Sequence, residues 1–413
     1  MNLQQFDIVI SGGGLSGCLM ALSLAHLTHT DGSALSIAII ETTEIQKSIK
    51  QTFDDRVLAL AHGSASYLQQ LGAWSAIKKQ ACAIKNIHIS DRGHYGKARL
   101  SAKEHDVNAL GYVVPMAVIG EALVAALANT KNITWFTPDS IETIDYDAEQ
   151  VSINLASKQQ LSAKLLLGCD GGNSVCRQMA NITASESDYQ QAAIIANVAC
   201  EYAHQGKAFE RFTEHGPLAM LPMTNYSIPN ISSKQRDKDS QGRCSLVWTL
   251  PPEQANQIAK LADSEFAQQL EQHFGTWLGQ ITHVGRRDVY PLKLIQAKEN
   301  TYHRMALVGN AAHTIHPIAG QGFNLGLRDV KQLAELIEQA LTIKQDIGSL
   351  SLLNTYSSLR AKDLQQVISL TDSLVTLFSN QLPPLVAGRN IGLKVLNYMK
   401  PLKNALVKKT MGY

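Results

Sequence analysis

Residues 6–25 read FDIVISGGGLSGCLMALSLA, and residues 36–41 read SIAIIE. The first stretch passes from an apolar run through the pattern G-x-G-x-x-G to apolar residues at helical spacing, which predicts a strand, a tight turn and a helix. The second predicts a buried strand that ends on an acid, Glu41, 24 positions after Gly17. Together the two stretches predict a dinucleotide-binding βαβ unit.

Each glycine of the pattern has its own task. Gly12 permits the turn, Gly14 lets the backbone approach a pyrophosphate, and Gly17 lets the helix pack closely on the strand. The helix N-terminus offers unpaired N–H groups and a partial positive charge to an anion. Glu41 is placed to accept the ribose hydroxyls, which favours FAD or NAD over a phosphorylated ribose. A glycine-rich turn alone has structural explanations, so the prediction depends on the strands and the acid as well.

The composition of the whole chain argues against other classes of function. A length of 413 residues indicates about two domains. Lys and Arg together number 37 and Asp and Glu 35, so the molecule has no electrostatic field suited to nucleic acid. Six cysteines without disulfide-like spacing suit a reducing cytoplasm. Because no apolar run reaches about 18 residues and no leader pattern is present, we expect a cytoplasmic protein that does not span a membrane.

Strand and helix patterns alternate through the first part of the chain, and strand patterns dominate the middle third. The first part has predicted strands at 83–90, 112–114, 141–145, 151–155 and 164–167 and a helix at 115–128. The middle third has extended segments at 189–212, 243–250 and 288–294, a polar insert at 225–242 and a helix at 264–274. We therefore expect parallel βαβ elements followed by an antiparallel substrate domain.

Arg56 lies in a polar segment before a predicted amphipathic helix and has two interpretations. In the first, its guanidinium pairs with Asp54 or Asp55 on the surface, a common arrangement that contributes little to stability. In the second, it reaches the cofactor pyrophosphate, because a planar guanidinium suits phosphate oxygens. The local pattern does not separate the two.

Two further turns follow predicted strands. Residues 168–177 read GCDGGNSVCR, in which turn chemistry explains the polar cluster and Ser174 can cap a helix that contains Arg177. Residues 304–313 read RMALVGNAAH, a buried strand and a small-residue turn, and a proline-containing bend then leads to a second helix start at 320–324. Packing alone does not explain two such turns, and we expect them to face a phosphate or a flavin.

Three motifs together resemble those of the flavin-dependent aromatic hydroxylases, the family of para-hydroxybenzoate hydroxylase. GGGLSG matches the family's FAD-binding turn, GCDGGNSVCR its G-A-D-G-x-x-S-x-V-R, and GNAAHTIHPIAGQG its G-D-A-A-H-x-x-x-P-x-x-G-Q-G. The chain departs at Asn310, where the family has an Asp that contacts the ribityl chain of FAD, and at Cys176, where it has Val. Asn keeps a carbonyl acceptor, so we expect FAD binding to survive in a less negative environment.

Within that family the chain is most similar to the ubiquinone-biosynthesis hydroxylases, in particular the 2-polyprenyl-6-methoxyphenol hydroxylase branch. The similarity is carried by FDDRVLALAHGSASYLQQLGAW, HISDRGHYG, FERFTEHGPLAMLP and NAAHTIHPIAGQGFNLGLRDV. It implies an α/β fold with a Rossmann-like FAD-binding domain, a substrate domain on a mixed or antiparallel sheet, and C-terminal helices. The expected division is 1–80, 113–185 and 296–345 for FAD binding, 81–112 and 186–295 for the substrate domain, and 346–413 for the C-terminal helices.

The resemblance implies ring hydroxylation with FAD as cofactor, NAD(P)H as co-substrate, and O2 and a polyprenyl phenol as substrates. NAD(P)H reduces FAD, O2 adds at flavin C4a, and the hydroperoxide transfers an OH to the ring, converting 2-polyprenyl-6-methoxyphenol into 2-polyprenyl-6-methoxy-1,4-benzoquinol. The phenol activates its own ring, so no catalytic acid or base is assigned. Three alternatives remain: a sister hydroxylase for another ring position, an FAD reductase or dehydrogenase without oxygen insertion, and a non-catalytic assembly subunit.

By the same resemblance, a defined set of residues is expected to hold the flavin. The helix that starts near Gly322 would aim its positive end at the flavin N1 and C2 carbonyl. Asp170 and Arg177 would guard the pyrophosphate and the nicotinamide approach. The flavin-positioning residues would be Pro317, Gly320, Gln321 and Gly322. The cofactor-binding residues would be Gly12, Gly14, Gly17, Glu41, Arg56, Asp170, Gly309, Asn310, Gly322, Phe323 and Asn324.

Two remaining patterns concern a metal and the tail. His313 and His316 have i, i+3 spacing but no third ligand nearby, so we expect structural histidines and no metal. Residues 373–413 contain no Asp or Glu, and their basic residues alternate with apolar ones. That tail fits a solvated helix face, peripheral contact with anionic lipid on the inner face of the membrane, or docking of other ubiquinone-biosynthesis proteins. Its six basic residues are Arg389, Lys394, Lys400, Lys403, Lys408 and Lys409.

Overall fold

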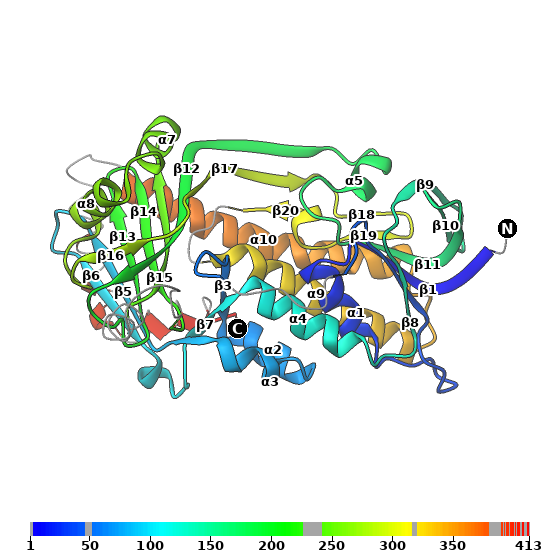
Figure 1. Cartoon of the computed structure of the whole chain (residues 1–413). Helices are drawn as coiled ribbons and strands as arrows, with labels where there is room; N and C mark the ends of the chain where they lie inside the picture. Colours follow the sequence, from blue (N-terminus) through cyan, green and yellow to red (C-terminus); the bar gives the residue numbers. More distant parts are fainter. Residues whose placement is uncertain are drawn as a thin grey trace.

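A computed structural model of the chain describes residues 3–45, 52–225, 242–315 and 320–379 and scattered positions from 390 to 412. Two large sheets lie toward opposite ends of the molecule (Figure 1). The long paired strands β12 (Ala184–Cys200) and β17 (Asp288–Ala297) run between the two ends, as does the helix α10 (Leu350–Ser379). This α/β architecture confirms the predicted fold class.

The first large sheet has a parallel core, as the βαβ pattern predicts. Its parallel strands are, in order, β8 (Ile133–Phe136), β2 (Ile37–Ile40), β1 (Leu3–Ser11), β11 (Gln160–Gly168) and β19 (Met305–Leu307). The antiparallel additions are the hairpin β9 (Ile141–Tyr146) and β10 (Val151–Leu155) beside β11, and β18 (Thr301–Tyr302) beside β19. The predicted strands at 141–145, 151–155 and 164–167 are confirmed.

Helices cover both faces of this sheet. On one face lie α1 (Leu15–Leu24), α4 (Met116–Leu127) and α9 (Gln321–Thr342). α1 is apolar on all sides because β1, α4 and α9 surround it, and full burial of a side chain such as Leu19 contributes about 1.5–3 kcal/mol. α1 begins directly after the glycine turn and ends at Leu24. The short helix α5 (Val175–Met179) packs on the other face.

The second large sheet is antiparallel except where β13 pairs with β5. Its order is β20-β17-β12-β15-β14-β13-β5-β6, with β16 beside β12. The helices α7 (Pro252–Ala259) and α8 (Asp263–Phe274) cover its outer face, where Trp248 and Phe266 are buried. The remaining strands are β5 (Asn86–Asp91), β6 (Lys97–Ser101), β13 (Lys207–Thr213), β14 (Gly216–Pro222), β15 (Cys244–Leu250), β16 (Ile281–Val284) and β20 (His313–Thr314).

A small third sheet has the order β3-β7-β4. In the sequence, its strands lie between strands of the two large sheets. Its strands are β3 (Val57–Ala61), β4 (Cys82–Ile84) and β7 (Gly111–Pro115). The segment predicted as one amphipathic helix after Arg56 is instead β3 followed by α2 (His62–Gln70) and α3 (Trp74–Ile77). The short 3-10 turns are η1 (Lys78–Gln80), η2 (Ala102–His105) and η3 (Gly309–Ala311).

Other local predictions differ from the structure in the middle third. The segment 189–212 is two strands rather than one, since the chain turns at 201–206, where Gly206 has a φ of 71°. α7 was not predicted because its sequence is short and polar. Of the polar insert 225–242, residues 226–241 lie outside the described residues.

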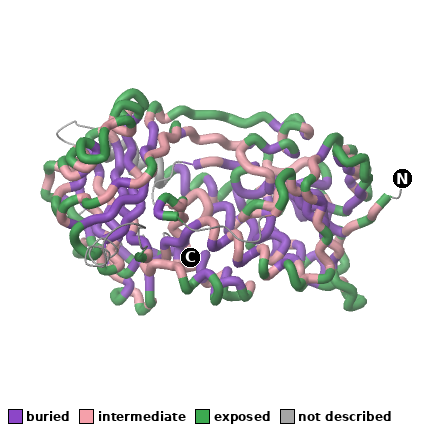
Figure 2. Tube along the Cα trace, in the orientation of Figure 1, coloured by how far each residue is buried: buried purple, intermediate pink, exposed green. Residues whose placement is uncertain are grey.

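Burial follows the sheets. Figure 2 shows buried residues gathered in both large sheets and in the helices beside the parallel one, whereas the first half of β12 is mostly exposed. Within residues 81–112, which the sequence assigns to the substrate domain, β5 and β6 join the antiparallel sheet, whereas β4 belongs to the small third sheet. Residues 313–314 also join that sheet, within a segment assigned to FAD binding. The boundaries of the six-part division stay a prediction.

Candidate functional site

A cavity of about 840 Å³ lies between the two large sheets and takes its walls from both. One end is lined by the carboxyl ends of β1, β2 and β11 and the turns that follow them. The other end is lined by the inner face of the antiparallel sheet. Ligands of open α/β sheets bind outside the carboxyl ends of the strands, and the volume is within the range of roughly 300–1,000 Å³ that ligand pockets have.

The glycine turn between β1 and α1 forms one wall of the cavity. Gly12 has a φ of 97°, and a Cβ there would lie 2.6 Å from the carbonyl oxygen of Cys169. A Cβ on Gly17 would overlap the carbonyl oxygen of Gly12. A Cβ on Gly14, in contrast, would meet no atom within 4 Å, and Gly14 lines the cavity. The backbone is therefore packed against protein at Gly12 and Gly17 and open to a ligand at Gly14.

Glu41 follows β2 and closes the cavity on that side. Its carboxylate accepts hydrogen bonds from the N–H of Gly13 at 2.7 Å and from the N–H of Thr43 at 3.0 Å. Burial alone would raise the pKa of Glu41, but the hydrogen bonds from Thr43 and Gly13 hold the pKa below its ordinary value. Glu41 is therefore a carboxylate at neutral pH, the state needed to accept ribose hydroxyls.

Asp170 follows β11 and lies in the cavity wall beside the glycine turn. Its Oδ2 accepts a hydrogen bond of 3.0 Å from the N–H of Cys176. Its Oδ1 is buried and finds no hydrogen-bond partner among the described residues. Because an unpaired buried acceptor costs about 1–3 kcal/mol, Oδ1 indicates a donor that belongs to a bound molecule.

Arg177 does not line the cavity. Its guanidinium donates to the carbonyl oxygens of Ala311 and Gly172, each at 2.7 Å. Ser174 caps α5 by accepting the N–H of Arg177 at 3.0 Å, as predicted. Arg177 thus holds the Asp170 turn against η3, and this placement does not support the expected role at the nicotinamide approach.

The turn η3 brings Gly309 and Asn310 to the cavity, and Asp329 of α9 holds that turn from behind. Asp329 Oδ2 accepts the N–H of Gly309 at 2.9 Å and lies 2.8 Å from Nε2 of His313, and its Oδ1 accepts Nε–H of Arg360 at 2.6 Å. Burial alone would raise the pKa of Asp329, but the neighbouring His313 and Arg360 hold the pKa below its ordinary value. This buried network fixes the position of η3.

The start of α9 contributes only some of the residues expected there. Gly320, Gly322 and Phe323 line the cavity, whereas Gln321 and Asn324 do not. Gly320 has a φ of 63°, which lets the chain turn into the helix. The remaining predicted positions, His316 and Pro317, lie outside the described residues.

Asn324 is a structural residue rather than a wall of the cavity. It is buried, and its amide is fully used within the protein. Its Oδ1 accepts the N–H of Ala61 at 2.8 Å and Oγ–H of Ser64 at 2.7 Å, and its Nδ2 donates to the carbonyl oxygens of Ala59 and Gly320. These bonds attach the start of α9 to β3.

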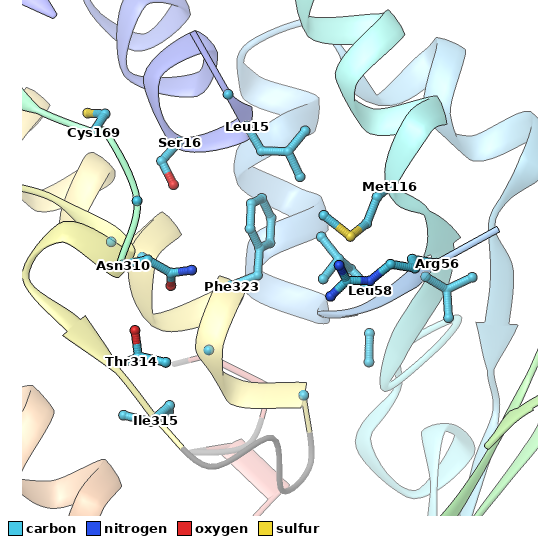
Figure 3. Close-up of a pocket in the computed structure, with 18 of the residues that line it drawn as sticks. Leu15, Ser16, Arg56, Leu58, Met116, Cys169, Asn310, Thr314, Ile315 and Phe323 are labelled. Atoms are coloured by element: carbon cyan, nitrogen blue, oxygen red, sulfur yellow. The ribbon is translucent and has the colours of Figure 1, made fainter. Parts of the chain in front are cut away.

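Arg56 reaches into the cavity from the side opposite Asn310 (Figure 3). Its guanidinium carbon lies 5.1 Å from the centre of the Tyr290 ring, within cation–π distance. The surface ion pair with Asp54 or Asp55 is absent from the described part of the chain, where both acids accept backbone N–H groups instead. The placement favours the second interpretation, a guanidinium directed at a bound molecule.

The inner face of the antiparallel sheet is apolar where it lines the cavity. Cross-strand register places Ile195, Val247 and Ala219 side by side on β12, β15 and β14. Glu210 of β13 comes next to Ala219 and also lines the cavity. Burial raises the pKa of Glu210 to about 7. An apolar wall with one carboxyl group suits an aromatic molecule that carries one hydrogen-bond donor.

Sequence patterns did not identify Asp329, Arg360 or Glu210. Asp329 lies on the apolar face of α9. An acidic residue at such a position indicates a buried polar network. Glu210 alternates with apolar residues in KAFERFT, so the period of a strand places its side chain on the buried face with those of Ala208 and Phe212. Neither signal reveals what surrounds the side chain, because the neighbouring side chains come from distant elements.

The residues at the first end of the cavity fit FAD, the cofactor that the motifs predict. The open backbone at Gly14 admits a pyrophosphate at the start of a helix. The ionised Glu41 suits a ribose, and the unpaired Oδ1 of Asp170 can accept a hydroxyl or a water held by the cofactor. One wall of the cavity thus combines a tightly packed turn, a turn that is open to a ligand, and two hydrogen-bond acceptors.

The chain is similar in sequence and in fold to known proteins. The family described as FAD binding domain matches residues 5–371. The chain is 33% identical over 411 residues to ubiquinone hydroxylase UbiL of Rhodospirillum rubrum, covering 98% of this chain and 89% of that protein. It is 30% identical to the 3-demethoxyubiquinol 3-hydroxylase of Escherichia coli, with 100% of both chains covered. The solved structure of p-nitrophenol 4-monooxygenase PnpA from Pseudomonas putida has the same fold, with a TM-score of 0.75 at 18% identity over 99% of each chain.

Proposed function

The chain belongs to the FAD-binding-domain family as an FAD-dependent monooxygenase with NAD(P)H as co-substrate, and on that premise we propose that it hydroxylates a polyprenyl phenol in ubiquinone biosynthesis. The observation that carries the proposal is the continuous cavity, which runs from the glycine turn to an apolar sheet face. Two relatives that match nearly the whole chain are named as a ubiquinone hydroxylase and a 3-demethoxyubiquinol 3-hydroxylase. Both names support the same pathway.

The proposed substrate is 2-polyprenyl-6-methoxyphenol and the product 2-polyprenyl-6-methoxy-1,4-benzoquinol. The stretch FERFTEHGPLAMLP, which carries the resemblance to that branch, forms most of β13 and β14 in the cavity wall. Burial of apolar surface there favours a prenylated ring by about 25 cal/mol per Å². Hydroxylation of a related prenylphenol at another ring position is a second candidate, favoured by the name of the Escherichia coli relative.

Bound FAD would supply the redox chemistry, which is hydride uptake from NAD(P)H and activation of O2 for transfer of one oxygen atom to the ring. The chain's own residues bind and orient the reactants. Gly14, Asp170 and Glu41 are assigned to the phosphate and sugar end of the cofactor. The first residues of α9, around Gly322, present the positive end of a 22-residue helix to the cavity and favour negative charge on the cofactor ring. Phe323 and the sheet face exclude water from the ring being hydroxylated.

The other two interpretations of the chain make different predictions. An FAD reductase or dehydrogenase would use the same cavity without inserting oxygen, so isotopic oxygen in the product separates it from a monooxygenase. A non-catalytic assembly subunit has no need of an open turn at Gly14 or of an unpaired buried acceptor at Asp170. Both features favour a protein that works with a bound cofactor.

Peripheral attachment to a membrane is part of the proposal, because the substrate is a lipid. No helix in the described ranges is both long and apolar enough for a membrane crossing. In the tail, Tyr398 is 80% and Met399 51% exposed, close to the exposed Lys394. Lys403, in contrast, is buried and pairs with Glu104 at 2.6 Å, so it is not available to lipid. The apolar and basic exposed residues together suit an anionic bilayer surface.

The quinone intermediates of cells that lack this protein test the proposal. We expect 2-polyprenyl-6-methoxyphenol to accumulate in aerobic growth and to disappear when the intact gene is restored. Accumulation of a different prenylphenol would keep the reaction class and move the ring position. An unchanged quinone profile would contradict the proposed pathway.

A further inference from the structure

Glu210 is a carboxyl group in an apolar wall. Its strand partner in β14 is Ala219, and in β5 it is Ile89. The next residues of the same row across the sheet are Val247 and Ile195. The row ends at Asp288 of β17, beside Ile195, and Asp288 does not line the cavity. Within this row, Glu210 is thus the ionisable residue that lines the cavity.

The cations of the same strand do not serve Glu210. Lys207 and Arg211 lie at odd offsets from Glu210, so their side chains point to the opposite face of the sheet. Lys207 indeed lies 5.8 Å from the ring centre of Phe209, on that face. Within the part of the chain that the structure describes, no hydrogen bond or ion pair to the Glu210 carboxylate is found, and burial alone shifts its pKa.

Two of the charged groups that share the cavity, Glu41 and Asp170, lie at its other end, beside the glycine turn of the parallel sheet. Arg56, which directly precedes β3, reaches the antiparallel sheet, where its guanidinium carbon lies 5.1 Å from the ring centre of Tyr290 on β17. Glu210 lies on the antiparallel sheet, where the proposed aromatic substrate would lie. A phenol hydroxyl would supply the donor that this carboxylate does not find among the described residues.

We propose that Glu210 binds the hydroxyl group of the phenol substrate and accepts its proton during ring hydroxylation. This inference rests on the proposed function, since it assigns a role toward that phenol. Removal of the proton makes the ring more electron-rich at the positions ortho and para to the oxygen, which speeds attack by an electrophilic oxygen. General-base help of this kind contributes about 10²- to 10⁴-fold to the rate.

The atoms of the step balance without an added reactant. The phenol O–H bond breaks and a Glu210 O–H bond forms as the ring carbon forms its new C–O bond. That carbon then loses its hydrogen as a proton to solvent, the ring becomes aromatic again, and the first oxygen recovers the proton from Glu210. The transferred oxygen comes from O2, and NAD(P)H supplies the two electrons that convert the other oxygen atom into water.

The electrostatics of the wall suit this role. Burial among apolar side chains raises the pKa of Glu210 to about 7, which makes the carboxylate a stronger base than an exposed glutamate. A base with a pKa near the working pH is present in its deprotonated form and still has a driving force for proton transfer. The apolar side chains of the sheet, rather than a charged neighbour, therefore raise the pKa of Glu210.

The test compares flavin-loaded wild type, Glu210→Gln and Glu214→Gln with the soluble probe 2-prenyl-6-methoxyphenol. Gln keeps the shape of Glu but cannot accept the proton. Glu214 is the matched control, because it lies in the turn after β13, is half-exposed and pairs with Arg92 at 3.5 Å. We expect the hydroxylation kcat to fall about 100-fold or more in Glu210→Gln at unchanged FAD content, and to stay within twofold in Glu214→Gln.

A ring-fluorinated form of the probe, whose hydroxyl is more acidic, supplies a readout that a purely structural role would not change. The ratio of wild-type to Glu210→Gln rates should shrink toward one with the fluorinated phenol, because less base is needed. Equal ratios for the two phenols, or a Glu210→Gln rate within twofold of wild type, would overturn the inference. Failure of the wild type to hydroxylate either phenol would instead overturn the proposed function, and this inference with it.

Discussion

Gly14 and Gly17 are three positions apart in one motif, yet different neighbours constrain them. At Gly17 a side chain would overlap the backbone of Gly12, so the requirement comes from folding. At Gly14 a side chain would enter the cavity, and its backbone φ of −71° is open to any residue. The requirement for glycine at position 14 therefore comes from the bound cofactor alone.

Gly14→Val is expected to fold and to purify without FAD. The valine side chain fills the space above the start of α1 that the pyrophosphate needs, while the backbone keeps its conformation. The ratio of flavin to protein absorbance measures the outcome, and we expect less than about a tenth of the wild-type ratio, a loss of roughly 1.4 kcal/mol or more in binding. Gly120→Ala, a helical glycine outside the cavity, is the control and should keep its flavin. Full flavin content in Gly14→Val would refute the assignment of this turn.

Glu210 should make the protein less stable as the pH rises. Its pKa is about 7 in the folded chain and 4.5 in the reference state, so the unfolded state loses the proton first. Stability falls as the pH rises from about 4.5 through 7, by a total on the order of 3 kcal/mol. Thermal midpoints at pH 5 and pH 8 test this: Glu210→Gln should gain several degrees over wild type at pH 8 and little at pH 5. A difference that does not change with pH would contradict the raised pKa of this carboxyl group.

At the scale of elements, α9 connects three parts of the site. Its first turn reaches the cavity, Asn324 attaches it to β3, and Asp329 attaches it to η3. Arg360 of α10 and His313 complete the same buried network. The helix therefore sets the distance between the two turns that face the cofactor.

Asp329→Asn is expected to lower both stability and flavin content. The change removes one of the two carboxylates that pair with the buried Arg360, and Asp363 remains. The expected cost is therefore below the roughly 3–5 kcal/mol of a fully broken buried pair, at about 2–3 kcal/mol. The pKa of Asp329 is held below its ordinary value, so this contribution is present at pH 7 and is lost only as the pH falls through that lowered pKa. Urea unfolding at pH 7 measures the loss. Glu335→Gln removes an exposed carboxylate from the same helix and should cost under about 0.5 kcal/mol; equal effects of the two variants would contradict the account.

Local patterns predicted the elements that depend on local spacing. The βαβ unit, the Ser174 cap and the strands of the parallel sheet are each determined by a few adjacent residues. The patterns did not predict that Asn324 would hydrogen-bond within the protein, because its partners at 59 and 61 are more than 260 positions away. The same reason applies to Asp329, whose partner Arg360 lies on another helix. Register across β12, β15, β14 and β13, which gives Glu210 its apolar neighbours, is likewise a tertiary property.

At the scale of the whole molecule, the cavity exists because one chain builds two sheets of different type. The parallel sheet supplies strand ends and helix starts for a charged cofactor, and the antiparallel sheet supplies an apolar wall. β12 and β17 run from one region to the other and hold the two at a fixed separation. Cofactor chemistry and substrate recognition therefore meet where the sheets face each other.

The tail should bring this assembly to an anionic membrane. We expect the protein to sediment with vesicles of phosphatidylglycerol and phosphatidylcholine and not with phosphatidylcholine alone. The double variant Lys394→Gln and Lys408→Gln should bind about 30-fold more weakly, because each basic residue near the surface contributes about 1 kcal/mol. Lys298→Gln with Lys344→Gln, two exposed lysines outside the tail, is the control. Equal binding to neutral and anionic vesicles would contradict the electrostatic part of this prediction.

The most direct test of the central claim is the source of the oxygen in the product. Purified, flavin-loaded protein is supplied with NAD(P)H, 2-prenyl-6-methoxyphenol and ¹⁸O2, and the product is analysed by mass spectrometry. The account predicts a benzoquinol that carries one ¹⁸O atom on the ring, formed with one NAD(P)H oxidised per product. A product without ¹⁸O, or NAD(P)H oxidation that leaves the ring unchanged, would contradict a monooxygenase acting on this phenol.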